Sequence, residues 1–507
     1  MLSNNLPSTD VSTQSVAAAT TTLPNGYSRE WPIIVENLQK IANREKVFGS
    51  IAAWIEFVKD LDQKIVDDCM NNNRDDDDDG SVQEVSRSTD YHFRNLSFLY
   101  KKMNISDKKE AKEHSLMSEK EFMEKVVPKI AQWILDLERE FPSGKIPVLM
   151  MNASGVVRLT KRQIRSIMSC AFCCLFRERG DVSKKNMGVF EFGLFWSVAS
   201  QNFLMSLFHY FERMYKLDND SSTSSSLDEI ILFERKVLKN NYRRFIEEEI
   251  CKSQQKMCPL LFKQGKIQDN LNHLMVDFAN CMIGGHVLGG AVAQEEILFV
   301  ECPELFASIL ICPQMQVHET IKFTGFERYS NLKGYIKSMT YETYLDNQPV
   351  IENVRKNQLI AMDALQGVGI FQFQKEFILR EIFKTTCAFT SKENDFLKDS
   401  SSDLPTLENE PIASGFWGCG MFGGDKQLKT IIQWLSATLC NRPSLTIHLF
   451  SPEDEKIEQD FNTKILPLIV EKELSLGQVA DALLNTYQSV RKTTSFSIFE
   501  FLHQNFK

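Results

Sequence analysis

The sequence Val276-Asp277-Phe278-Ala279-Asn280 opens the most informative part of this chain. It reads as a short apolar strand, and the turn Gly284-Gly285-His286 and the triplet Gln294-Glu295-Glu296 follow it. Glycines let a backbone approach a ligand closely, and paired acids are the residues that cleave glycosidic bonds. The pattern therefore predicts a strand, a glycine-rich turn and an acidic helix start around one ligand.

Each of these residues has a simpler interpretation when it is taken alone. Asp277 and Asn280 are good turn residues, and two acids in the first turn of a helix complement its dipole. The ligand hypothesis rests on the three motifs occurring together. Glu295 and Glu296 would diverge by about 100° on a helix, so they can serve different groups of one ligand. Loss of water is expected to raise the pKa of one of them.

Composition narrows the classes of protein. The chain has 507 residues, 43% of them hydrophobic, and a net charge of −9, which disfavours bulk nucleic-acid coating. Twelve cysteines are scattered without paired CxxC motifs, so we expect no zinc site and no other metal. The N-terminus shows no secretory pattern, so the cysteines are predicted to be reduced thiols in an intracellular protein.

The chain divides by pattern into three parts. Residues 1–27 are rich in Ser, Thr and Asn and are predicted to be a disordered tail, and residues 28–250 a helical region with the acidic loop Asp75–Asp79 and a Ser-rich loop. The basic stretch from Arg235 to Arg244 is placed on a helix, either as a solvated face or as a dock for a phosphate polymer. The apolar segment Phe190–Phe211 is interpreted as a buried helix because its polar residues disfavour a membrane span.

After about residue 250 strands alternate with helices, which indicates an α/β layer structure. We predict a catalytic unit over residues 251–500, with strands at Leu274–Phe278, Thr320–Phe326, Leu359–Ala364 and Leu445–Phe450 and with helices near 294–310, 373–385, 426–440 and 476–490.

A second glycine block runs from Gly415 to Asp425 and feeds a helix, with Asp425 as its expected N-cap. A glycine-rich turn at a helix N-terminus suits a diphosphate. The first glycine stretch, Gly284–Gly290, does not fit the GxxxxGK[ST] loop and has no lysine after it, which counts against a nucleotide triphosphatase. Tyr335, after Gly334, is either a core residue or a ring that stacks on a base.

These motifs, in this order, resemble those of the poly(ADP-ribose) glycohydrolase family. The resemblance also includes Thr324-Gly325 with Tyr329-Ser330, Ala361-Met362-Asp363-Ala364 and Trp417-Gly418-Cys419-Gly420, and it covers about residues 150–490. It implies a macrodomain-like mixed β-sheet flanked by helices, with an N-terminal helical accessory region. It also implies hydrolysis of the ribose–ribose O-glycosidic bonds of poly(ADP-ribose), without a cofactor.

The resemblance implies roles residue by residue. Glu296 would be the general acid/base, Glu295 would hold ribose hydroxyls, and Asp277 would support that geometry. Phe450 is a possible wall on the ribose side. The implied substrate-binding set is Ile267, Gln268, Asn280, Gly284, Gly285, Gln294, Tyr335, Phe416, Gly418, Cys419, Gly420, Met421 and Phe422. Within this set, Ile267 and Gln268 lie on the adenine side, Tyr335 folds over the adenine, and the segment from Gly418 to Phe422 binds the diphosphate.

The chain departs from the family pattern at two positions. His286 replaces a third loop glycine, which costs of order 1 kcal/mol if that position requires a positive φ, and Phe416 stands where many members have asparagine. These departures motivate an alternative, a weakened or inactive ADP-ribose-binding module. A third hypothesis is a helical scaffold that binds protein partners through its basic face.

The partners implied are poly(ADP-ribose) and poly(ADP-ribosyl)ated proteins, with no sequence-specific nucleic-acid recognition and no membrane. We expect a monomer, in the nucleus or cytoplasm or both, with a role in the DNA damage response.

Overall fold

The computed structural model describes residues 20–24, 30–50, 116–176, 186–239, 250–391, 409–490 and 497–507, with further single positions in 53–64 and 244–248. The acidic loop Asp75–Asp79 lies outside these residues.

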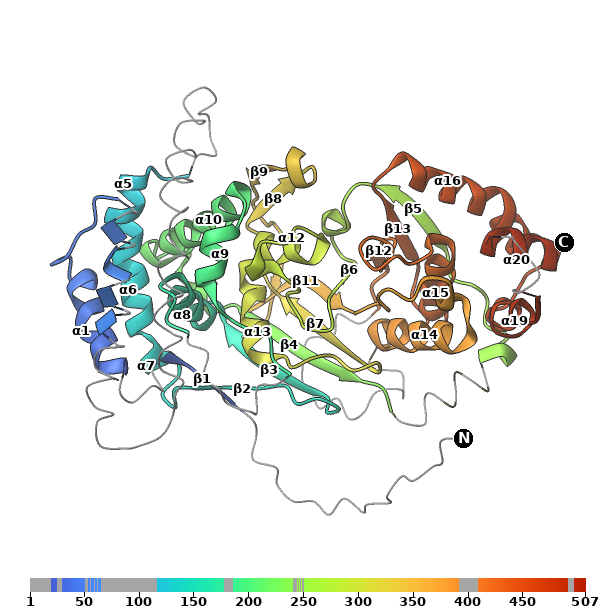
Figure 1. Ribbon diagram of the computed structural model, residues 1–507, viewed down its shortest axis with the longest axis horizontal. Coiled ribbons are helices and arrows are strands. Elements are labelled where there is room, and N and C mark those ends of the chain that lie inside the picture. The colour runs from blue at the N-terminus through green and yellow to red at the C-terminus, as the bar shows by residue number, and fades with distance from the viewer. Residues whose placement is uncertain are drawn as a thin grey trace, which may run out of the picture.

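A mixed sheet of nine strands forms the centre of the molecule (Figure 1). In spatial order its strands are β3 (Gly155–Thr160), β4 (Ile230–Val237), β7 (Glu319–Gly325), β11 (Val354–Ala361), β6 (Leu274–Asp277), β12 (Ile412–Ser414), β13 (Leu445–Leu449) and β5 (Leu260–Gln264), with β10 (Val350–Ile351) paired to β11. The five strands from β11 to β5 are parallel, whereas β3, β4 and β7 pair antiparallel. Two small sheets pair β1 (Thr20–Thr22) with β2 (Lys145–Pro147), and β8 (Ser330–Lys333) with β9 (Thr340–Thr343).

The central strands are apolar because both faces of the sheet are covered. Along β6, Leu274 and Val276 belong to one hydrophobic core, and Met275 between them belongs to the other. In β11 the same alternation places Leu359 in one core and Ile360 in the other. Successive side chains of a strand point to opposite faces, so helices must lie on both sides.

Two sets of helices cover these faces (Figure 1). The core that contains Met275 is built from α1 (Glu30–Ala42), α6 (Val127–Leu135), α8 (Lys161–Phe172), α9 (Phe192–Val198), α10 (Gln201–Asn219), α12 (Gln294–Glu301) and α13 (Ser308–Ile311), with the short helices α5 (Glu119–Glu121) and α7 (Leu137–Glu140) nearby. The other core is built from α14 (Lys375–Phe389), α15 (Lys426–Leu439), α16 (Pro452–Asp460), α17 (Leu466–Glu471), α18 (Leu476–Asp481), α19 (Tyr487–Val490) and α20 (Ile498–Phe506). The predicted α/β class, a mixed sheet flanked by helices, is confirmed.

The basic stretch was assigned to the wrong element. Arg235 and Lys236 lie in β4 and are buried. The Arg235 guanidinium pairs with the carboxylate of Glu319 on β7, and Lys236 donates to the carbonyl oxygens of Ala388 and Thr390. Neither the solvated face nor the polymer dock predicted for these two residues exists, because their charges are satisfied inside the protein.

The segment Phe190–Phe211 is buried, as predicted, but it forms two helices. The chain leaves the helical conformation at Ala199, and the Ser200 hydroxyl caps α10 by accepting from the Phe203 amide. In the part of the chain that the structure describes, no helix combines the length and apolar character needed to cross a membrane.

The proposed division near residue 250 does not coincide with the edge of the sheet. Strands β3 and β4 come from the region before residue 250, and β4 pairs with β7 from the region after it. The predicted disordered tail also contributes structure, since Thr20–Thr22 form β1. The accessory region therefore completes the sheet of the catalytic region and shares its core.

Candidate active site

Strand β6 delivers Asp277 to the face of the sheet that α12 covers. Asp277 lies two residues after Met275, so both side chains point to the same side. Met275 shares its core with Ile297, Leu298 and Phe299 of α12. The carboxyl end of β6 and the first turn of α12 are thus brought together.

The side chain of Gln294 fastens these two elements. Its Oε1 accepts from the Phe278 amide at 2.8 Å, and its Nε2 donates to the Val276 carbonyl oxygen at 2.9 Å. Both ends of the amide are engaged by the backbone of β6 and of the residue that follows it. Gln294 thereby fixes the start of α12 against the strand, and its contact with substrate stays a prediction.

Glu295 and Glu296 hold the glycine-rich turn from two directions. The Glu295 carboxylate accepts from the amides of Asn280 at 2.8 Å and Gly284 at 2.7 Å. The Glu296 carboxylate accepts from the amides of His286 at 3.0 Å and Ala293 at 2.8 Å. Both side chains are buried. Each acid thus takes its own pair of backbone donors, as expected for adjacent residues on a helix.

Gly285 lies between the two carboxylates and has no room for a side chain. Its φ is +54°, and a Cβ there would lie 2.6 Å from Glu295 Oε2 and 2.6 Å from Glu296 Oε1. Those two oxygens are therefore within about 5 Å of each other. The glycine lets the backbone pass between both acids, a conformation that L side chains resist.

His286 fits the turn without backbone strain. Its φ is −114°, whereas Gly284 and Gly285 before it have φ of +86° and +54°. A cost in backbone strain was expected only if position 286 had a positive φ, and because its φ is negative no such cost arises. The imidazole is exposed and lies against Gly289, where a Cβ would be 2.6 Å from His286 Cδ2.

Asp277 is the unusual member of the acidic group. It is fully buried, and within the described residues neither of its carboxyl oxygens has a hydrogen-bond partner. Burial, followed by the nearby Glu296 charge, raises the pKa of Asp277 well above its usual value. Burial and the Asp277 charge also raise the pKa of Glu295, against the effect of its two backbone donors. These environments favour the protonated form of Asp277 over its ionised form.

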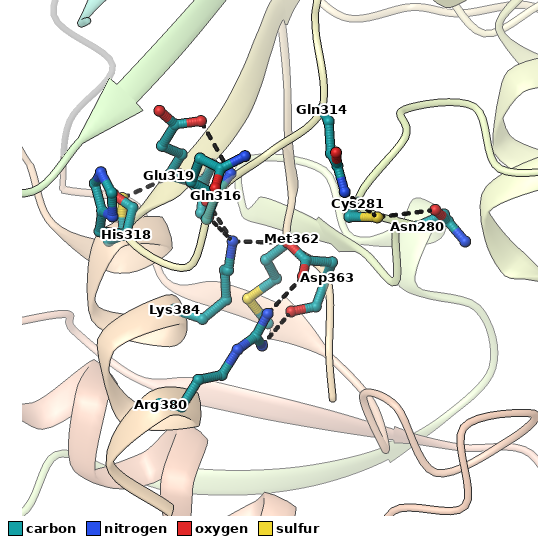
Figure 2. A network of polar contacts seen from close by, with 12 residues as sticks. Asn280, Cys281, Gln314, Gln316, His318, Glu319, Met362, Asp363, Arg380 and Lys384 are labelled. Carbon is teal, nitrogen blue, oxygen red and sulfur yellow. Dashed lines mark hydrogen bonds and ion pairs between the residues drawn. The ribbon is translucent and has the colours of Figure 1, made fainter. Parts of the chain in front are cut away.

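Neighbouring strand ends are anchored by polar contacts (Figure 2). The Asn280 Oδ1 accepts from the Met282 amide at 3.0 Å and from the Cys281 thiol, which itself accepts from Gln314 Nε2. After β11, the Asp363 carboxylate pairs with Arg380 at 2.5 Å and Lys384 at 2.7 Å, both from α14. These contacts hold Asn280 at the start of the glycine-rich turn and Asp363 at the end of β11.

The second glycine block forms a loop at the start of α15. Gly418 has φ of +72°, and its carbonyl oxygen accepts from the Gly424 amide at 2.9 Å, which closes the loop. Asp425 caps α15 by accepting from the Leu428 amide, as predicted. Among the described residues, no protein acceptor takes the amides of Gly420, Met421 and Phe422. Amides left in this state at a helix N-terminus suit an anionic ligand.

A buried ion pair lies beneath this loop. The Lys429 ammonium pairs with the Glu381 carboxylate and lies 4.0 Å from the centre of the Trp417 ring. A Cβ on Gly418 would be 3.3 Å from Lys429 Nζ. Glu381 also accepts from the Leu365 amide at 3.1 Å. This pair thus joins α14, α15 and the loop after β11.

The remaining candidate residues differ in exposure. Ile267 is fully buried, Phe416 is 9% exposed with Lys426 Nζ 5.1 Å from its ring centre, and Cys419 and Phe422 are half-buried. Met421 is 86% exposed and Phe450 is 62% exposed. Tyr335, 55% exposed, lies in the turn between β8 and β9.

Two family models match the chain in the order in which its parts occur. The first, described as the helical domain of poly(ADP-ribose) glycohydrolase, matches residues 114–235, and the second, described as its macro domain fold, matches residues 247–459. Together they cover about two thirds of the chain. The chain belongs to the poly(ADP-ribose) glycohydrolase family.

Curated members of the poly(ADP-ribose) glycohydrolase family are similar to this chain, two from a plant over most of their length and one from a nematode over a smaller part. Probable poly(ADP-ribose) glycohydrolase 2 of Arabidopsis thaliana is 29% identical over 440 residues, which span 76% of this chain and 81% of that protein. Poly(ADP-ribose) glycohydrolase 1 of the same plant is 26% identical over 471 residues, 76% of this chain and 83% of that protein. Poly(ADP-ribose) glycohydrolase 1 of Caenorhabditis elegans is 31% identical over 242 residues, 44% of this chain and 29% of that protein.

Sequence reasoning missed the buried charges that support the site. Lys429 and Glu381 lie beneath the glycine loop, and Glu301 ends α12 with no exposed surface. One signal was available, because Glu301 follows the apolar run Ile297–Val300 at the end of a helix. A lone acid beside such a run predicts a buried partner of opposite charge.

Proposed function

We propose that this chain hydrolyses the ribose–ribose O-glycosidic bonds of poly(ADP-ribose) and releases ADP-ribose. The observation that carries the proposal is the convergence of Glu295 and Glu296 on Gly285, with Asp277 near enough for the Glu296 charge to raise its pKa, within a member of the glycohydrolase family. Because Gly285 has no side chain, the turn packs against both acids and fixes the two carboxylates beside each other.

In the proposed reaction, Glu296 acts as general acid and then as general base. Its carboxyl group gives a proton to the departing ribose oxygen as the glycosidic bond breaks, and an oxocarbenium-like centre forms on the remaining ribose. Water then adds to this centre while the Glu296 carboxylate accepts its proton. Both Glu296 oxygens accept from backbone amides, so the carboxyl group stays in one orientation through both steps.

Glu295 and Asp277 assist the reaction, Glu295 by binding the substrate and Asp277 by limiting the charge near Glu296. Glu295 is held by two amides and would accept hydrogen bonds from ribose hydroxyls. Because burial raises the pKa of Asp277, the protonated form of this group is favoured, which limits the negative charge beside Glu296. The loop Gly418–Phe422 would bind the diphosphate through its amides, and Tyr335 would cover the adenine, with Gln268 beside it.

The substrates, cellular location and oligomeric state that we propose follow from this function. The substrates would be poly(ADP-ribose) chains on modified proteins in the nucleus, the cytoplasm or both, within the DNA damage response, and the enzyme would act as a monomer. We also retain the division into an N-terminal tail, an accessory region to residue 250 and a catalytic region to residue 500 as a proposal.

The test uses purified protein, labelled poly(ADP-ribose) and a Glu296→Gln variant, with free ADP-ribose measured over time. Glu376→Gln is the matched control, because Glu376 is an exposed acid in the first turn of α14. We expect release by the wild type and the control and none by Glu296→Gln. No release by any of the three, with polymer binding retained, would identify a binding module instead.

A further inference from the structure

The buried carboxylate of Glu301 gathers three hydrogen-bond donors and one guanidinium at the C-terminal end of α12. Glu301 Oε1 accepts from Lys266 Nζ at 3.3 Å and from the Leu332 amide at 2.6 Å, and Oε2 accepts from Gln268 Nε2 at 3.1 Å. The Arg328 guanidinium forms an ion pair with Oε2 at 3.0 Å, while its Nε–H donates to the Ser330 carbonyl oxygen. Glu301 has no exposed surface. These five residues form the Glu301 cluster, in which both oxygens of the carboxylate accept hydrogen bonds and its charge is paired with Lys266 and Arg328.

The cluster joins two elements that are far apart in sequence. Lys266 and Gln268 flank Ile267 at the 3₁₀ helix η7 (Ile267–Asp269), whereas Leu332 lies in β8, which leads to Tyr335. Arg328 strengthens the junction, since its Nη1 donates to Asp269 Oδ1 at 2.8 Å. Glu301 is six residues after Glu295, about 9 Å along the helix at 1.5 Å per residue. One helix thus carries the acids at one end and this junction at the other.

The chemistry of the cluster fixes the direction of the Gln268 amide. An ionised carboxylate can only accept hydrogen bonds, so Gln268 must turn its NH2 group toward Glu301. Its carbonyl Oε1 then faces away from the cluster, and among the described residues none donates to it. Gln268 is half-buried, so a ligand can reach this oxygen. The outward-facing group is an acceptor.

We propose that Glu301 is a positioning residue that sets the base preference of the site. By holding the NH2 group of Gln268, it presents a carbonyl oxygen to the base and selects a 6-amino purine over a 6-oxo purine. The 6-amino group donates to this oxygen, whereas a 6-oxo group would place two acceptors together. The inference rests on the proposed function, which puts Gln268 on the adenine side.

The experiment compares binding of ADP-ribose with binding of inosine diphosphate ribose, which differs only by a 6-oxo group and the N1 proton. Calorimetry with the full chain measures both affinities. We expect the wild type to prefer ADP-ribose by on the order of 10- to 100-fold. In Glu301→Gln the Gln268 amide can turn over, because the new side-chain amide at position 301 supplies a donor as well as an acceptor, and the preference is expected to fall below about threefold.

A reciprocal exchange distinguishes positioning from general damage. In the double variant Glu301→Gln with Gln268→Glu, the amide at 301 donates to the carboxylate at 268, whose other oxygen faces the base, so the preference should return. If Glu301→Gln does not fold, the double variant, which keeps the charge of the cluster, and Gln268→Met, which has no acceptor of this kind, provide the comparison. Preference in Gln268→Met equal to that of the wild type overturns the inference.

Failure of the inference and failure of the function give different results. Equal binding of both ligands by a wild type that cleaves polymer would overturn the base selectivity alone. A wild type that binds neither ligand and releases no ADP-ribose would overturn both.

Discussion

The substitution Gly285→Ala tests the geometry of the two acids most directly. The new methyl group would lie 2.6 Å from oxygens of both Glu295 and Glu296, about 0.8 Å inside the 3.4 Å at which ordinary contact begins. Each carboxylate is fastened by two backbone amides, so neither can retreat without losing hydrogen bonds. A misplacement of about 1 Å at a reaction centre costs on the order of 100-fold in rate.

We therefore expect Gly285→Ala to lower kcat with poly(ADP-ribose) by on the order of 100-fold. The positive φ of +54° adds a stability cost of about 1–2 kcal/mol, measurable by urea unfolding. Initial rates of ADP-ribose release at saturating polymer measure the effect on kcat.

Gly369→Ala is the matched control. Gly369 has a similar φ of +49°, but a Cβ there would meet nothing within 4 Å. It should carry the same conformational cost and leave kcat unchanged. A Gly285→Ala enzyme with kcat within about threefold of the wild type would refute the reasoning, because the carboxylates would then tolerate the shift that the geometry forbids.

Three further substitutions address other features. Because burial raises the pKa of Asp277 in the folded state, the unfolded chain releases a proton that the folded chain keeps, and stability falls as the pH rises above about 4. Between pH 5 and 6, the free energy of unfolding of Asp277→Asn in urea should therefore rise relative to that of the wild type by up to about 1.4 kcal/mol. A difference between the two proteins that does not change with pH would contradict this. Lys429→Met removes the ammonium beside the buried Glu381 carboxylate, which keeps its ion pair with Arg380, and should cost about 1–3 kcal/mol. The double variant Lys429→Met with Glu381→Gln should recover part of this loss, and strictly additive losses would show that the pair does not interact. Tyr335→Ala should change the free energy of unfolding by no more than about 0.5 kcal/mol, since the residue is 55% exposed, and should raise KM for polymer. An unchanged KM would show that the Tyr335 ring does not contact the base.

The sequence was most informative where structure is set locally. Asp277 ends β6 and Asp425 caps α15 as expected, because strand ends and helix caps depend on a few neighbouring residues. The positive φ of Gly284 and Gly285 follows the same rule. A short glycine turn followed by two acids could therefore be read as one site from the chain alone.

Long-range pairing accounts for the errors. Arg235 and Lys236 were assigned to a helix with solvent or a polymer as partner, yet they lie in β4 with the Glu319 carboxylate and backbone carbonyls as partners. Nothing near them in sequence indicates these groups, which come from β7 and α14. The backbone strain considered for His286 also does not arise. Its φ is −114°, and this value depends on how Glu296 holds the turn.

The shared sheet bears on how this protein can be divided. A fragment beginning at residue 251 would lose β4, and β7 would become an open edge strand with unpaired backbone donors and acceptors. It would also expose Phe323, whose ring centre lies 5.9 Å from that of Phe233 in β4. Uncovered edges of this kind pair with other chains, so such a fragment should self-associate and aggregate. The helical region therefore protects the catalytic sheet from intermolecular strand exchange, in addition to adding mass beside it.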